Sequence, residues 1–153
     1  MKIDDIRWIN LQTVCDNRGC LTAIEFEQII PFEVKRVFYM HNVVQGADRG
    51  GHAHRDTDQF AIALHGSMKI IISDGLETRT VILDNPGWGI NLPRLTWTSL
   101  VDFSDGAVCM VLASTQYDKS RSIRTWSEYL TELEVPHYPE LSTGPALLHP
   151  ENK

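Results

Sequence analysis

Two histidines one residue apart, His52 and His54, are the side chains in this sequence best suited to chemistry. In a β-strand, residues i and i+2 project from the same face, so both imidazoles are expected to point together. The ordinary pKa of histidine lies near neutrality, so such a pair could remove a proton from one atom and deliver one to its neighbour. The same pair could instead bind a metal ion or form a structural hydrogen bond.

Short β-strands are the elements that would position these histidines. Runs rich in β-branched and aromatic residues alternate with Gly, Asp and Asn turn signals, which is typical of an antiparallel sandwich or barrel. One helix is expected within 122–133, because Ile123, Trp126, Leu130 and Leu133 recur on one helical face. The expected strands cover residues 21–26, 35–40, 59–64, 67–72, 78–83, 88–92, 96–100 and 107–113.

Length and composition indicate one globular domain. The chain has 153 residues, of which 42% are hydrophobic and 22% charged, enough for a single hydrophobic core. We expect the domain to span residues 1–133 and an extended Pro-rich tail to follow over 134–153. The net charge of −6 argues against a general nucleic-acid-binding protein.

The ends and the cysteines favour a cytoplasmic protein. The N-terminal stretch MKIDDIRWINL carries acids where a secretory signal would be apolar, and no apolar run is long enough to span a membrane. Cys15, Cys20 and Cys109 are an odd number of cysteines without zinc-binding spacing, so we expect free thiols.

The spacing around the histidine pair resembles the first motif of cupin-type jelly-roll barrels. Gly46 and Gly66 fit the glycines that flank that motif, but Gln59 stands where metal-binding cupins have a glutamate. The segment 85–100, which would supply the last ligand, contains no histidine and offers only Thr98. A neutral amide is a weak ligand and two histidines lack the carboxylate of the common iron triad, so we expect no metal.

Several separated motifs extend the resemblance to a particular cupin family. From residue 8 to about 130, the chain resembles the sugar-nucleotide 3,4-ketoisomerases, the WxcM-like or FdtA/QdtA-type cupins. The motifs are DNRGCLTAIE, IPFEVKRVFYM, RGGHAHR, LHGSMKIIISDG, LDNPGWGINLP and the segment from DFS through VLAS and YD to IR. The resemblance implies an all-β, single cupin-type jelly roll with a short C-terminal helix and an extended tail.

The same resemblance implies an activity. It implies an isomerase that moves the keto group of a dTDP-4-keto-6-deoxyhexose from C4 to C3 through an enediol, for the synthesis of 3-amino-3,6-dideoxy sugars. It implies no metal and no other cofactor, and a homodimer that can exchange strands. The C4 ketone acidifies the C3 hydrogen, so one side-chain base suffices. The chain also lacks the glycine-rich fingerprint of a nicotinamide site.

Residue roles follow from the motifs that match. His52 and His54 match the catalytic pair of the family, with His54 as the expected base, and Tyr39 matches its active-site tyrosine. Arg36 and Arg49 are expected at the pyrophosphate. The full set expected to bind substrate is Arg18, Arg36, Arg49, Gln59, Trp97 and Thr98.

Two departures from the family keep alternatives open. Thr98 stands where the family has histidine or arginine, and DKSRSIR at 118–124 lacks the usual acids and tyrosine. The configuration at C4 of the product therefore stays open. Three other functions are considered: a metal-dependent cupin enzyme with His52, His54 and Gln59 as ligands, a sugar-nucleotide 3,5-epimerase, and a non-catalytic sugar-nucleotide-binding module.

Overall fold

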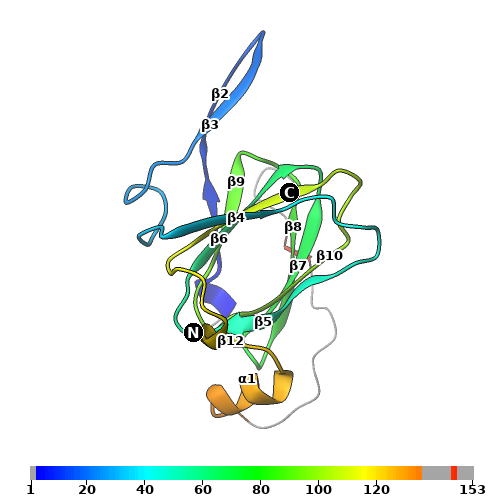
Figure 1. Ribbon diagram of the computed structural model, residues 1–153. Coiled ribbons are helices and arrows are strands. Elements are labelled where there is room, and N and C mark those ends of the chain that lie inside the picture. The colour runs from blue at the N-terminus through cyan, green and yellow to red at the C-terminus, as the bar shows by residue number, and fades with distance from the viewer. Residues whose placement is uncertain (1–2, 136–145, 148–153) are drawn as a thin grey trace.

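Two β-sheets that face each other form the body of the molecule (Figure 1). The structure is a computed structural model, and it describes residues 3–135 and 146–147. One sheet has the strand order β1 (Arg7–Asn10), β9 (Trp88–Leu92), β6 (Gln59–His65), β11 (Val108–Ala113) and β4 (Arg36–Met40). The other has the order β12 (Ser122–Ile123), β5 (Arg49–His54), β10 (Trp97–Val101), β7 (Met68–Ser73), β8 (Thr78–Leu83) and β13 (Ala146–Leu147).

This arrangement confirms the expected all-β jelly roll. Neighbouring strands are mostly far apart in sequence, as when β10 lies between β5 and β7. The core fills the space between the sheets, where Ile70, Ile72, Val81 and Ile90 are almost completely buried. Along β7 buried and half-buried residues alternate, because successive side chains of a strand point to opposite faces.

Seven of the eight predicted strands lie within one residue of an observed strand at each end, and 35–40 and 107–113 are among them. The predicted strand 21–26 is displaced, since β3 covers Gly19–Ala23. Strands β1, β2 (Gln12–Asp16), β5, β12 and β13 were not predicted as separate runs. In β5 the reason is local, because the left-handed glycines Gly50 (φ 82°) and Gly51 (φ 72°) interrupt the β-type composition.

Helix α1 (Trp126–Glu132) closes one end of the body (Figure 1). Thr125 caps it by accepting a hydrogen bond from the backbone N–H of Glu128. The helix is shorter than the expected 122–133, because Ser122 and Ile123 pair with β5 as β12 instead. The buried Tyr129 hydroxyl lies 2.9 and 2.7 Å from the Ser73 and Leu95 carbonyl oxygens, which share its one proton, and this contact fixes the helix against the sheet.

A two-stranded arm, β2 (Gln12–Asp16) and β3 (Gly19–Ala23), projects from the body (Figure 1). Cys15 and Cys20 lie directly opposite each other in this hairpin and form a disulfide. The expectation of free thiols is therefore wrong for these two residues and right for Cys109, which is free and buried. The turn signal DNRG between the two cysteines is what brings them into register.

The predicted tail over 134–153 lies mostly outside the described residues. Of its later part, the structure describes only Ala146–Leu147, which pair in parallel with β8. Among the described residues, no helix combines the length and the apolar character needed to cross a membrane.

Reduction of the Cys15–Cys20 disulfide should loosen the arm without unfolding the body. A two-stranded hairpin alone is marginally stable, and a disulfide that closes so short a loop contributes about 2 kcal/mol in the chain-entropy account. Amide exchange over 12–23 should then accelerate roughly 30-fold in reductant, measured by hydrogen–deuterium exchange mass spectrometry. A Cys15→Ser/Cys20→Ser variant should match the reduced protein, and Cys109→Ala should respond to reductant as the wild type does. Unchanged exchange after confirmed reduction would contradict this role.

Candidate active site

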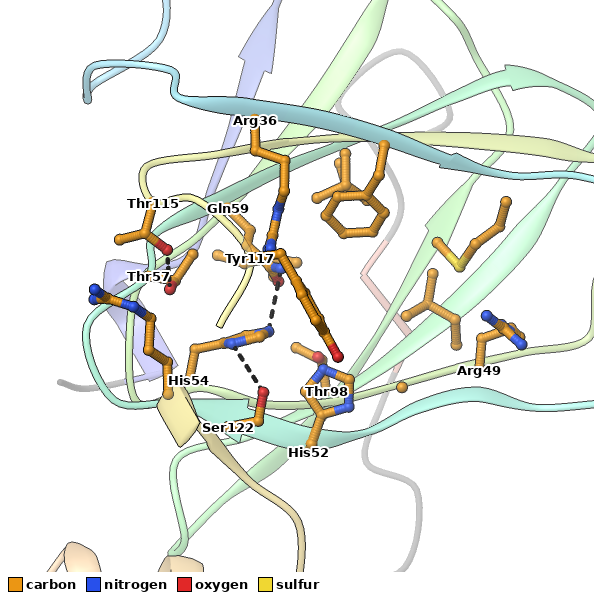
Figure 2. A pocket seen from close by; sticks show the side chains of 18 of the residues that line it. Arg36, Arg49, His52, His54, Thr57, Gln59, Thr98, Thr115, Tyr117 and Ser122 are labelled. Atoms are coloured by element: carbon orange, nitrogen blue, oxygen red, sulfur yellow. Dashed lines mark hydrogen bonds between the residues drawn. The ribbon is translucent and has the colours of Figure 1, made fainter. Parts of the chain in front are cut away.

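A cavity of about 480 Å³ opens between the two sheets. Its size suits a small organic ligand. Strands β4, β5, β6, β10 and β11 line it together with the segment 115–124 (Figure 2). The structure brings seven of the predicted site residues to this cavity: Arg36, Tyr39, Arg49, His52, His54, Gln59 and Thr98.

The histidines enter the cavity from β5. His52 and His54 are half-buried, and their rings lie 4.9 Å apart, edge to face. Ala53 between them is completely buried on the opposite face, in the cluster beneath α1. Gly50 is needed where β5 passes β10, because a Cβ there would lie 2.8 Å from the Thr98 carbonyl oxygen. The Arg-Gly-Gly run thus allows the close strand pairing that presents both imidazoles.

Burial holds both histidines in the neutral form. Desolvation is the largest cause that lowers the pKa of His52, although a backbone hydrogen bond at Gly50 opposes it. The pKa of His54 falls to about 4, first through desolvation and then through the nearby His52, Arg36 and Arg124. At neutral pH both rings therefore have a lone pair available to accept a proton.

His54 has a side-chain partner at each ring nitrogen. The Gln59 amide nitrogen lies 3.3 Å from Nε2, and the Ser122 hydroxyl oxygen lies 3.5 Å from Nδ1 (Figure 2). Gln59, on β6, is 9% exposed, so its amide is held inside the cavity. Sequence reasoning placed Gln59 near the histidines but did not identify Ser122.

Arginines give the cavity a cationic wall. The Arg36 guanidinium lies over the Phe38 and Tyr117 rings, at 5.2 and 5.4 Å from their centroids. Within the described part of the chain, neither Arg49 nor Arg124 forms an ion pair. Guanidinium groups of this kind suit the oxygens of a diphosphate.

The segment 115–124 supplies site residues that sequence reasoning missed. Tyr117, Arg121, Ser122 and Arg124 all line the cavity, although the sequence marked this segment only as part of a family motif. Its density of basic residues was the available signal. Arg121 forms an ion pair with Asp56, which ties this segment to the end of β5.

Two predicted substrate-binding residues lie outside this cavity. Arg18 lies in the turn of the arm, where its largely exposed guanidinium pairs with Asp16. Trp97 packs against Trp126 and Tyr129, with ring centroids 5.4 Å away in each case, because it points to the face of β10 opposite Thr98. Trp97 is thus not among the residues that line this cavity, and its expected contact with substrate stays a prediction.

Tyr39 lies at the edge of the cavity and is 63% exposed. Its ring lies 5.4 Å from that of His41 rather than against the histidine pair. Among the described residues, no three His, Cys, Asp or Glu side chains gather where they could hold a metal ion. The arrangement can accept and donate protons beside an anion-binding wall.

Comparisons with known proteins agree with this geometry. The family model described as "WxcM-like, C-terminal" matches residues 4–134. The chain is 38% identical over 121 residues to the TDP-4-oxo-6-deoxy-alpha-D-glucose-3,4-oxoisomerase of Aneurinibacillus thermoaerophilus, which covers 79% of this chain and 87% of the relative.

Solved structures show the same fold. The sugar 3,4-ketoisomerase QdtA from Thermoanaerobacterium thermosaccharolyticum, in complex with TDP, superposes with a TM-score of 0.84 at 35% identity over 86% of this chain and 96% of that one. The WlaRB TDP-quinovose 3,4-ketoisomerase from Campylobacter jejuni gives a TM-score of 0.81 at 37% identity over 84% and 99%. The expected cupin-type jelly roll is confirmed, and the chain belongs to the WxcM-like family of sugar-nucleotide 3,4-ketoisomerases.

Proposed function

We propose that this cavity moves the keto group of a dTDP-4-keto-6-deoxyhexose from C4 to C3. The observation that carries the proposal is the pair of half-buried, neutral histidines, His52 and His54, whose rings lie 4.9 Å apart beside a wall of arginines. Two groups that can exchange protons suit an isomerisation between adjacent carbons. The relatives named as TDP-sugar 3,4-ketoisomerases support this substrate class.

The chemistry is a proton shift with no net oxidation. The C4 ketone acidifies the C3 hydrogen, and His54 accepts that proton as the C3–H electron pair forms the C3–C4 double bond of an enediol. His52 or Tyr39 then delivers a proton to C4, as the proton of the C3 hydroxyl passes to the C4 oxygen. Exchange with solvent restores the proton that this donor gave up and removes the one that His54 took. The ketone is left at C3, and each electron pair stays within the sugar.

The cationic wall would hold the nucleotide end of the substrate. Arg36 and Arg49 lie in the cavity lining and are assigned to the diphosphate, because guanidinium can bind phosphate oxygens in a bidentate manner. Gln59 and Thr98 lie nearer the histidines and are assigned to the sugar. A fixed diphosphate would place the sugar carbons beside the bases, which is the positional contribution to the rate.

The partner of this enzyme is proposed to be a second copy of the chain, with which it can exchange strands. All five residues of β2 are exposed, and Val14 and Leu21 on the arm are 71% and 67% exposed. A groove of about 920 Å³ between arm and body is lined in part by Val14 and Leu64. In a homodimer these surfaces would be covered, and a sugar-binding role for Arg18 would require the arm to reach the cavity of the other copy.

Replacing His54 with asparagine should abolish turnover. His54→Asn removes the ring nitrogen that accepts the proton while keeping a polar side chain, so kcat should fall by roughly 10²- to 10⁴-fold. The assay is NMR of the sugar formed from dTDP-4-keto-6-deoxyglucose, with dTDP binding measured by calorimetry. Binding should stay close to that of the wild type. His65→Asn, at the exposed end of β6, is the matched control and should isomerise normally. Wild-type turnover by His54→Asn would remove His54 as the base.

The pH dependence of kcat/KM should reflect the protonation of the two histidines. The pKa of His54 lies near 4 and that of His52 below its ordinary value, so kcat/KM should be constant at neutral pH and fall only as acid protonates the rings. Gln59→Glu would put a carboxylate beside Nε2 of His54 and raise the pKa of that histidine. The fall of kcat/KM in acid, which is the acidic limb of the pH–rate profile, would then move to higher pH. Gln28→Glu, on an exposed loop, should leave the limb in place. An unmoved limb in Gln59→Glu would remove Gln59 from the site.

A charge on the arm should separate the two copies. Val14→Arg with Leu21→Arg would place two charges in the surface proposed to be covered, so sedimentation should show a monomer where the wild type is a dimer. Leu76→Arg, at a 61% exposed leucine in the turn between β7 and β8, is the control and should leave the dimer intact. A wild-type monomer, or a dimer of the arm variant, would contradict this proposal.

A further inference from the structure

Ser122 is the direct cross-strand neighbour of the expected base. It lies opposite His54 in the antiparallel pair of β12 and β5, where facing side chains share one side of the sheet. Its hydroxyl oxygen is 3.5 Å from Nδ1 of the His54 ring (Figure 2). The contact is long, and catalytic hydrogen bonds of this kind often tighten only when substrate is bound.

The two residues that precede Ser122 are held by hydrogen bonds and ion pairs. The Arg55 backbone N–H donates to the Arg121 carbonyl at 2.9 Å, and the Arg121 guanidinium pairs with Asp56. The Arg55 guanidinium donates to the Ser120 carbonyl at 3.0 Å and pairs with Glu128 of α1. These bonds fix the register of β12, so the position of the Ser122 side chain is set by the sheet and not by a free loop.

The two partners of His54 have complementary hydrogen-bonding roles. With the Gln59 amide nitrogen 3.3 Å from Nε2, the amide N–H donates and Nε2 accepts. A neutral imidazole has one N–H and one lone pair, so the proton is then on Nδ1, which donates to the Ser122 hydroxyl oxygen. Nε2 lies on the side of the cavity interior (Figure 2) and carries the lone pair, which accepts from the Gln59 amide in this structure and would be released to the substrate when the sugar binds.

We propose that Ser122 is a positioning residue for His54: by accepting the Nδ1 proton, its hydroxyl fixes the ring orientation and the tautomer in which Nε2 is the base. This role rests on the proposed function, because it matters for turnover only if His54 removes the C3 proton. The hydroxyl is neutral, so it orients the ring without attracting a proton to it, as a carboxylate at the same position would do.

The charges around His54 explain why a neutral hydroxyl, and not a carboxylate, suits position 122. His52 on the same strand, Arg36 on β4 and Arg124 after β12 all lower the pKa of His54, and only Asp56 raises it. A carboxylate in place of Ser122 would add a second anion, at hydrogen-bonding distance from Nδ1. It would oppose the burial that keeps the ring neutral, and part of the enzyme would carry a protonated His54 at moderately acidic pH.

The test measures both the tautomer of His54 and the kinetics of isomerisation in the wild type and in serine variants. In nitrogen–proton correlation spectra of ¹⁵N-histidine-labelled protein, with His54 signals assigned by their loss in His54→Asn, the wild type should show the Nδ1–H tautomer. Ser122→Ala should populate the Nε2–H tautomer and lower kcat roughly three- to tenfold with KM nearly unchanged, the effect of one neutral hydrogen bond. Ser122→Thr should restore both readouts, because it keeps the hydroxyl on a strand-compatible side chain.

Two further variants test the effect of charge at position 122 and of a serine removed elsewhere. Ser122→Asp should move the acidic limb of the pH–rate profile to higher pH, whereas Ser127→Ala on the exposed face of α1 should change neither tautomer nor rate. An Nε2–H tautomer in the wild type, or a Ser122→Ala variant with unchanged tautomer or unchanged kcat, would overturn the proposal. Absence of turnover in the wild type would instead remove the proposed function, and the spectra would still decide the role of Ser122.

Discussion

The alternation of side chains along β5 is the constraint on which the rest of the site depends. Ala53 is completely buried against Trp97, Ile123 and Tyr129, so the strand cannot rotate or slip by one residue without breaking that cluster. The residues on either side of Ala53 must then face the cavity, and they are the two histidines. Packing beneath α1 therefore makes both imidazoles point into the cavity on the opposite face of β5.

Burial and charge act together on these histidines. The cavity removes them from water, which disfavours the imidazolium form, and the nearby Arg36 and Arg124 disfavour it further. The same arginines suit an anionic nucleotide at one end of the cavity. One set of charges can therefore bind the substrate and keep the base unprotonated.

Sequence reasoning reached the fold and the histidine pair because both depend on local patterns. Strand composition, turn residues and the i, i+2 spacing are readable along the chain. The disulfide was missed because its pairing depends on the hairpin register. Trp97 and Thr98 were both expected at the substrate, but neighbouring residues of a strand face opposite sides, and Thr98 is the one that lines the cavity. Ser122 was missed because it reaches His54 only through the pairing of β12 with β5, across 68 residues of chain.

The account is tested most directly by NMR of the product formed from dTDP-4-keto-6-deoxyglucose in heavy water. Proton removal at C3 and delivery at C4 by different solvent-exchanging groups predict a 3-keto sugar with deuterium at C4 and none at C5. Deuterium at C5 would indicate an epimerase that uses the same fold for another carbon. Recovery of the unchanged 4-keto sugar would show that the histidine pair does not isomerise it, and either result would contradict the proposed reaction.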